Sequence, residues 1–553
     1  MGSVLAPLGR LFAAAFALVV LNQALVFRNV WPTPWITPGT AVTVELWVLL
    51  LGAAWLTRGP RRLSRRALHW VAIGYTALIM GRYAMVTAPA LYGRPIDLYW
   101  EAQHLPNVVA MLLTTMPPWL ALLALVAPVA LLGLLYLATK IAWRAVGAAL
   151  AKPVTRPALV LAGVTLVGWF VAGQFYAPLA TERWFAHRVS PLYFHQAAVL
   201  FGTWTGLAEA RRLPEPPALA SNLGRVREAD VLLVFLESYG ATGYDNPRHA
   251  AALASARAAL NDAIAASGGD VVSARIGSTT FGGGSWLAHS SWLAGTPITG
   301  AATYGILLKT ERPTWVTLFA AQGYRTLALM PGTRGPWPEG RFYGFDRIYD
   351  AAALDYRGPA FGWWRIPDQY SWARFEAVEL DGPRTQPRFV FFPTITSHMP
   401  FKPTPPLQPD RARLLGTEPF PADQVSAALA ESAAWTDFGA AYTDAIDYSL
   451  RMLAELLQRE AARERVVILL GDHQPPALVS GDGADWTVPI HVISRRPELL
   501  AALRTAGFTP GLGLPDQTLA PLPEASLLVL KALATPATPA PDSAPRHHDG
   551  VDR

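Results

Sequence analysis

Residues 231–238 read Val-Leu-Leu-Val-Phe-Leu-Glu-Ser, six apolar side chains followed at once by a carboxylate and a hydroxyl. An apolar run of this length, with β-branched and aromatic residues, predicts a strand that is buried on both faces. Such strands form parallel sheets covered by helices, and these sheets bind ligands beyond the carboxyl ends of their strands. Glu237 and Ser238 therefore occupy a position where chemistry is expected.

Similar apolar runs recur downstream and alternate with helical patterns. We expect strands at residues 231–236, 324–329, 388–394, 466–470 and 488–493, and helices at residues 248–267 and 436–459. This alternation predicts an α/β domain with a mostly parallel, helix-covered central sheet. Two further polar pairs, Ser397-His398 and Asp472-His473, come directly after strands of that sheet.

The N-terminal third has a different composition. The 553-residue chain is 52% hydrophobic and only 16% charged, which is unusual for a purely soluble protein. Apolar stretches of about 20 residues, the length that spans a bilayer core, occur at about residues 8–27, 41–57, 67–87, 118–139 and 157–178. These stretches predict an α-helical membrane domain of five spanning helices.

The positive charges of this third predict its orientation. Residues 1–178 contain 13 Lys and Arg but only three acidic residues. The bases concentrate at Arg10, between Arg58 and Arg66, and between Lys140 and Arg156, so these segments should face the cytoplasm. An odd number of spans then places the remainder of the chain outside. We expect a multi-pass protein of the inner (plasma) membrane with a periplasmic catalytic domain.

These patterns divide the chain into four regions. We expect a membrane domain at 1–178, a membrane-surface connector at 179–227, an exported catalytic domain at 228–534 and a disordered tail at 535–553. After residue 178 the chain holds 33 basic and 37 acidic residues, which argues against a nucleic-acid partner. Cysteine is absent, which excludes disulfides, thiolate metal ligands and a cysteine nucleophile.

A glycine-rich segment supplies a candidate nucleophile. Gly282, Gly283 and Gly284 precede Ser285, where a helical pattern begins. Backbone N–H groups at a helix start favour an anionic phosphate, and glycines allow its close approach. A serine hydroxyl is a poor nucleophile unless it is activated, for example by a metal. The simpler alternative is that Ser285 only caps the helix.

Three strand-end side chains provide suitable metal ligands. Glu237 and Asp472 offer carboxylates and His473 an imidazole, a donor set suited to zinc or manganese. Taken alone, an ordinary polar strand end is the favoured interpretation of Glu237, and a turn is the favoured interpretation of Asp472-His473. The joint occurrence of these residues with Ser285 favours one metal-dependent site.

The order of these motifs resembles the alkaline phosphatase and sulfatase superfamily. The matching stretches are Phe235-Leu236-Glu237-Ser238, Ser285, Thr394-Ile395-Thr396-Ser397-His398-Met399-Pro400-Phe401 and Leu470-Gly471-Asp472-His473. Within the superfamily, the chain is most similar to the membrane branch of lipoteichoic acid synthases (phosphoglycerol transferases), which also carries five spans before an extracellular catalytic domain. The resemblance implies an alkaline phosphatase-like fold.

The resemblance also implies roles for individual residues. Glu237, Ser285, Asp472 and His473 take the positions of the ligands of one divalent metal, and Ser285 is the nucleophile in place of the family's usual threonine. His398 falls where the family has a substrate-contacting histidine. Trp337 fits a tryptophan that binds glycerophosphate, whereas Arg341 lies further along the chain than the family's arginine.

The function implied is transfer of a phosphoglycerol or similar headgroup from a phospholipid donor, through a phosphoseryl intermediate, to a glycan or lipid-linked acceptor of the cell envelope. Three alternatives remain: a phosphoethanolamine transferase, although these usually carry disulfides; a phosphodiester hydrolase; and a degenerate membrane scaffold. Sulfate hydrolysis is disfavoured because residues 285–289 lack the sulfatase arginine. For His289 and His491, packing is favoured over substrate contact.

Overall fold

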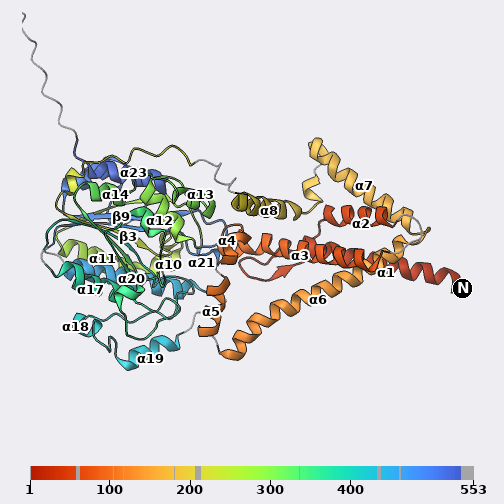
Figure 1. Ribbon diagram of the computed structural model, residues 1–553, viewed down its shortest axis with the longest axis horizontal. Helices are drawn as coiled ribbons and strands as arrows, with labels where there is room; N and C mark the ends of the chain where they lie inside the picture. Colours follow the sequence, from red (N-terminus) through yellow and green to blue (C-terminus); the bar gives the residue numbers. More distant parts are fainter. Residues whose placement is uncertain are drawn as a thin grey trace, which may run out of the picture.

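The computed structural model describes residues 2–57, 63–103, 105–115, 117–179, 181–205, 213–335, 337–382, 384–431, 437–459 and 463–536. A bundle of long helices lies beside a layered α/β domain, and a few short segments connect the two (Figure 1). Of the predicted tail, residues 537–553 lie outside the described residues.

The α/β domain is built on a nine-stranded sheet in the order β10-β4-β9-β8-β3-β7-β5-β6, with β11 beside β4. The strands are β3 (Asp230–Leu236), β4 (Asp270–Gly277), β5 (Arg325–Met330), β6 (Arg347–Asp350), β7 (Arg388–Pro393), β8 (Arg465–Gly471), β9 (Thr487–Ser494), β10 (Thr509–Pro510) and β11 (Thr518–Pro521). Strands β8, β3, β7, β5 and β6 are mutually parallel, whereas β9 runs antiparallel to β8 and β4. The sheet is therefore mixed.

Side chains of β3 alternate between two apolar layers. Leu232 and Val234 pack with one group of helices, and Leu233 and Phe235 pack with the other, because successive side chains of a strand point to opposite faces. The first group is α11 (Ala254–Ala266), α17 (Asp368–Phe375) and α20 (Gly439–Arg459); the second is α12 (Ser285–Ala294), α14 (Trp315–Ala321), α22 (Pro497–Thr505) and α23 (Leu522–Leu533). The α/β prediction is confirmed, with helices on both faces (Figure 1).

Two predicted helices have different limits in the structure. The helix expected at 248–267 is divided at Leu253 into two helices, and the helix expected at 436–459 begins at Gly439. The shorter helices are α9 (Thr242–Asp245), α10 (Pro247–Ala252), α13 (Ala301–Leu307), α15 (Gly340–Tyr343), α16 (Ala351–Leu354), α18 (Arg411–Leu414), α19 (Ala422–Ala430) and α21 (Ala477–Ser480). Strand β4 is absent from the predicted strands, because Ser273 and Arg275 interrupt its apolar pattern.

The five predicted apolar stretches fall on helices of the bundle. Its helices are α1 (Gly2–Val26), α2 (Val44–Leu56), α3 (Arg65–Tyr92), α6 (Pro118–Leu150) and α7 (Arg156–Phe175). Among the described residues, α3, α6 and α7 are long and apolar enough to cross a membrane. The 13 residues of α2 rise only about 20 Å against a bilayer core of about 30 Å. Three potential spans are thus established, and five remain a prediction.

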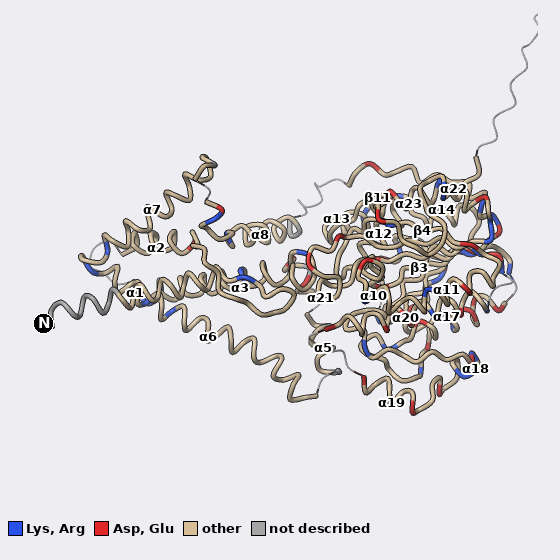
Figure 2. The backbone as a smooth tube through the Cα atoms, turned by 180° about the vertical axis from the view of Figure 1, so that it is seen from behind, with Lys and Arg blue, Asp and Glu red and all other residues tan. Residues whose placement is uncertain are grey.

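Charge separates the two parts of the molecule. Asp and Glu gather on the α/β domain, and the helices of the bundle carry few of them (Figure 2). Between the two parts lie α4 (Leu98–Gln103), α5 (Leu105–Thr115) and α8 (Ser190–Thr205). The last turn of helix α3 reaches the α/β domain.

Candidate active site

The pairing of β3 with β8 brings the first two acidic residues together. Leu236 pairs with Gly471 in a parallel ladder, so the next residues along each strand, Glu237 and Asp472, leave the sheet side by side. The backbone N–H of Ser238 donates to Asp472 Oδ1 over 2.8 Å, which ties the two loops. Both carboxylates are buried.

The neighbouring strand β7 supports Glu237 from its other side. Thr394 Oγ1 accepts a hydrogen bond from the Glu237 backbone N–H over 3.0 Å. Ser397 Oγ donates to the Glu237 carbonyl over 2.6 Å. Thr394 and Ser397 therefore hold the backbone of Glu237 in place. Sequence reasoning did not assign this role to either residue.

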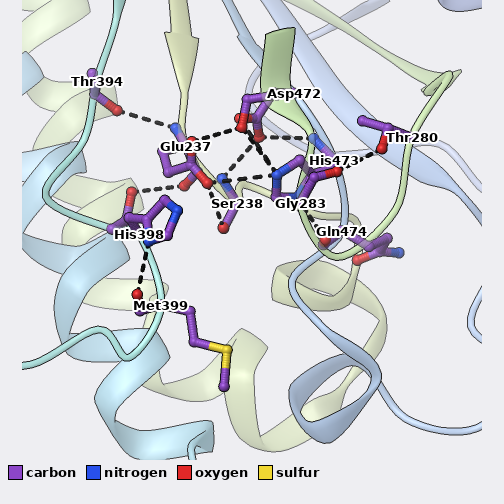
Figure 3. Close-up of polar contacts among 12 residues, drawn as sticks. Glu237, Ser238, Thr280, Gly283, Thr394, His398, Met399, Asp472, His473 and Gln474 are labelled. Atoms are coloured by element: carbon purple, nitrogen blue, oxygen red, sulfur yellow. Dashed lines mark hydrogen bonds and ion pairs between the residues drawn. The ribbon is translucent and has the colours of Figure 1, made fainter. Parts of the chain in front are cut away.

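Ser285 begins α12 directly after a left-handed Gly284, whose φ is 78°. Such a φ favours glycine because a Cβ atom would be strained there. The turn directs Ser285 Oγ at the strand ends, where it donates to Glu237 Oε2 over 2.9 Å and lies 3.2 Å from His473 Nε2. The structure thus brings together Glu237, Asp472 and His473 (Figure 3), and these two hydrogen-bond contacts add Ser285 to the group.

Hydrogen bonds fix the orientation of His473. Its Nδ1 lies 2.8 Å from the carbonyl of Gln474, and since a carbonyl only accepts, Nδ1 carries the proton and Nε2 presents a lone pair. Nε2 lies 3.5 Å from Glu237 Oε1 and 3.7 Å from Asp472 Oδ2. This arrangement is typical of a metal-ligating histidine held by an outer partner.

The four side chains fit a divalent cation. One ligand atom each of Glu237, Asp472 and His473 lies within 4.8 Å of the other two. Asp472 Oδ2 is buried and has no hydrogen-bond partner among the residues that the structure describes. A buried carboxylate oxygen without a partner is costly unless an ion compensates it. Burial and the adjacent Asp472 carboxylate raise the pKa of Glu237 well above its ordinary value. A cation would relieve this repulsion.

His398 lies beside the cluster on the loop after β7 (Figure 3). Its Nδ1 donates to the Met399 carbonyl over 2.7 Å, and its ring meets the edge of Trp364 with centroids 4.8 Å apart. Burial, together with the charge of His473, holds the pKa of His398 below its ordinary value. His398 is therefore neutral at physiological pH, with Nε2 available as an acceptor.

The two residues expected to bind glycerophosphate have other recorded surroundings. Trp337 stacks on Tyr343 with centroids 5.8 Å apart, and Tyr343 bonds Ser290 of α12 over 2.8 Å. Arg341 is exposed on α15. For the described residues, the structure records no hydrogen bond or ring contact between either side chain and the cluster.

The two histidines without an assigned role are both in packed surroundings. His289 lies against Phe235 with centroids 4.5 Å apart, and burial lowers its pKa to about 4. His491 contacts Tyr239, Tyr244 and Ser273 in the core, and burial lowers its pKa to about 3. These contacts agree with packing.

Sequence reasoning missed Gln474. Its carbonyl accepts from both His473 and the Gly282 N–H, the latter over 3.0 Å, and its side chain accepts from the Thr242 N–H over 3.1 Å. It thereby joins the loop of Asp472 and His473 to the glycine-rich loop before Ser285. In the sequence, its position directly after Gly471-Asp472-His473 is the feature that could have identified Gln474 as part of the site.

Comparison with known proteins gives one family match. Residues 230–487 match the family model described as Sulfatase. This segment contains β3 and all four clustered side chains. No curated protein matches the chain by sequence.

Several solved structures are similar to the chain. They include the lipoteichoic acid synthase LtaP from Listeria monocytogenes (16% identity, 52% of this chain and 69% of that chain, TM-score 0.35). A protein in the alkaline phosphatase superfamily from Vibrio parahaemolyticus matches at 15% identity over 60% and 77%, with a TM-score of 0.36. The phosphoglycerol transferase GacH from Streptococcus pyogenes, in complex with sn-glycerol-1-phosphate, matches at 11% over 58% and 94%, with a TM-score of 0.34. These TM-scores mark distant likenesses.

Proposed function

We propose that this protein is a metal-dependent phosphotransferase that moves a phospholipid-derived headgroup, phosphoglycerol first of all, to a cell-envelope acceptor. The match of residues 230–487 to the Sulfatase family model supports this proposal. The observation that carries the proposal is the convergence of the Ser285 hydroxyl with Glu237, Asp472 and His473. A nucleophile, two carboxylates and an imidazole at one buried point are suited to transfer at phosphorus.

Glu237, Asp472, His473 and the hydroxyl of Ser285 would hold one cation, zinc or manganese. When bound, such a cation lowers the pKa of a coordinated hydroxyl and offsets the negative charge of a phosphate. The hydrogen bonds of Thr394 and Ser397 to Glu237, and of Gln474 to His473, keep the ligands in place.

In the first half-reaction, Ser285 Oγ forms a bond to the phosphorus of the donor. The bond between phosphorus and the glycerol oxygen of diacylglycerol breaks, and the serine proton ends on that departing oxygen. The product is a phosphoseryl enzyme that carries the headgroup. The N-terminus of α12 and its preceding glycines favour the negative charge of the phosphate.

In the second half-reaction, an acceptor hydroxyl, on a glycan or lipid-linked acceptor, forms a bond to phosphorus. The Ser285 Oγ–P bond breaks, and the acceptor proton returns to the serine. The unprotonated Nε2 of His398 is placed to accept a hydrogen bond from a substrate hydroxyl. Trp337, which stacks on Tyr343 beside α12, and Arg341 remain candidates for headgroup contacts.

Replacement of Ser285 tests this proposal directly. Membranes containing the full chain are given phosphatidylglycerol or phosphatidylethanolamine with a labelled headgroup, and covalent label on the protein is measured after acid quenching. The wild type should carry label, and Ser285→Ala should carry none. Ser267→Ala, whose hydroxyl only bonds Ile264 at the end of α11, is the matched control.

The outcomes separate the possible activities. The lipid whose label moves identifies the headgroup, and release of free headgroup in the presence of acceptor identifies a hydrolase. Unchanged turnover in Ser285→Ala would defeat the proposed mechanism. A protein that purifies without metal and turns over neither lipid would instead fit a scaffold.

A further inference from the structure

The last turn of α3 meets the loop of the nucleophile through two glycines. Gly93 caps α3 with φ 71°, and a Cβ placed on it would lie 2.2 Å from the ring of Phe281. A Cβ on Gly282 would lie 2.4 Å from the carbonyl oxygen of Tyr92. Both separations are far shorter than van der Waals contact. The end of a long apolar helix therefore touches the segment that leads to Ser285.

The ring of Phe281 is held firmly at this contact. Phe281 is only 2% exposed and packs against Trp486 with ring centroids 5.9 Å apart. A side chain larger than hydrogen at Gly93 would therefore force either the ring or the helix to move. The Tyr92 carbonyl oxygen also lies close to Gly282, where a Cβ would have no room.

The loop of the metal ligands rests against the same helix end. Helix α21, which begins directly after Pro476, packs on α3. A Cβ on Gly282 would also lie 3.3 Å from Pro476 Cα. Both loops of the candidate site thus converge on the last turn of α3.

The internal shape of the nucleophile loop does not depend on α3. The Gly282 N–H donates to the Gln474 carbonyl over 3.0 Å, and Ser278 Oγ donates to the Asp472 carbonyl. Thr280 Oγ1 donates to the Gly283 carbonyl over 2.5 Å. These bonds lie within the α/β domain, so the contact with α3 fixes the position of the loop relative to the bundle.

We infer that the last turn of α3 supports the nucleophile loop, which runs from Ser278 to Gly284. This contact positions Ser285 beside the bundle, where it can react with a phosphodiester donor embedded in the membrane. This inference rests on the proposed function of Ser285. Gly93 and Phe281 are positioning residues in this arrangement. The position of Ser285 relative to the bundle affects its reaction with a donor held in the membrane. It does not affect the reaction with a soluble phosphodiester, because that substrate reaches Ser285 by diffusion.

Gly93→Ala in the full chain tests the inference with two substrates. Transfer from a labelled phospholipid in vesicles should fall by more than about tenfold, because a displacement of about 1 Å is enough for such losses. Hydrolysis of soluble bis(p-nitrophenyl) phosphate should stay within about twofold of wild type. Gly323→Ala is the control, since Gly323 has a similar φ of 82° but open space at its Cβ position.

A double-mutant cycle identifies the contact itself. If the clash with the ring is the cause, Gly93→Ala should have no further effect on lipid transfer in a Phe281→Ala background. Unchanged lipid transfer in Gly93→Ala, equal loss with both substrates, or additive effects in the cycle would overturn the inference. Failure of the proposed function would look different, because wild-type protein would then leave both substrates intact.

Discussion

Single residues carry most of the chemistry proposed for this protein. Asp472 is the clearest case, because one of its oxygens is tied to two backbone N–H groups while Oδ2 lies buried without a partner. A buried carboxylate oxygen in this state is an expected ligand position. Its loss should therefore affect the metal before it affects the fold.

Asp472→Asn should lower metal affinity by at least roughly tenfold, since an amide removes a charged ligand while keeping the side-chain shape. The measurement is the zinc and manganese content of the purified full chain after dialysis. Asp410→Asn, at the exposed cap of α18, should keep wild-type metal content. Equal metal in both variants would contradict the ligand role of Asp472.

His491 predicts a pH dependence of stability. Because burial lowers its folded pKa to about 3 from 6.5, the folded state binds its proton less readily than the unfolded state does. Stability should be unaffected by this group above pH 6.5 and should fall below it, by up to about 1.4 kcal/mol per pH unit. In thermal melts of the full chain between pH 7 and 5, His491→Gln should reduce this loss. The exposed His187→Gln should leave it unchanged.

At the scale of secondary structure, α12 joins the nucleophile to the core. Ser285 begins the helix, and Trp292, two turns later, is completely buried against Trp315 with ring centroids 5.5 Å apart. The helix is therefore held at its C-terminal half while its first residue contacts Glu237 and His473. Packing at one end thus determines geometry at the other.

Trp292→Ala should destabilise the α/β domain by about 3–5 kcal/mol, the usual cost of removing a buried aromatic ring. Turnover of the soluble phosphodiester should fall as well, because α12 loses the contact that orients Ser285. Thermal melting and release of p-nitrophenol measure the two effects. Leu429→Ala removes a half-exposed side chain of α19 and should change neither.

At the scale of the whole molecule, the distribution of charge predicts which part faces outward. Bases dominate the N-terminal third, whereas acidic groups gather on the α/β domain (Figure 2). The positive-inside rule then places the loop before α3 in the cytoplasm. The absence of cysteine from the chain makes this orientation testable with single introduced thiols.

Ser426→Cys on the exposed face of α19 should react with a membrane-impermeant maleimide in spheroplasts. Ser64→Cys, before α3, should react only after permeabilisation. Both serines are exposed, so the difference reports the side of the membrane. Labelling of Ser64→Cys alone in intact spheroplasts would reverse the proposed topology.

The sequence by itself predicted the α/β class, the long apolar helices and the strand-end residues, because these depend on local periodicity and on the residue types directly after each strand. It did not predict β4, β6, β10, β11 or the antiparallel direction of β9, because pairing partners depend on packing. In β4, for example, Ser273 and Arg275 interrupt the apolar run, so the segment lacks the pattern by which the other buried strands were predicted.

Only the tertiary structure decided how the separate motifs meet. The register of Leu236 with Gly471 places Glu237 beside Asp472, and the turn at Gly284 directs Ser285 at both. It also placed Gly93 of the bundle against Phe281, a contact between residues far apart in the sequence. Local patterns identify groups that are able to react, but distances between them exist only after the chain has folded, because long-range pairing sets them.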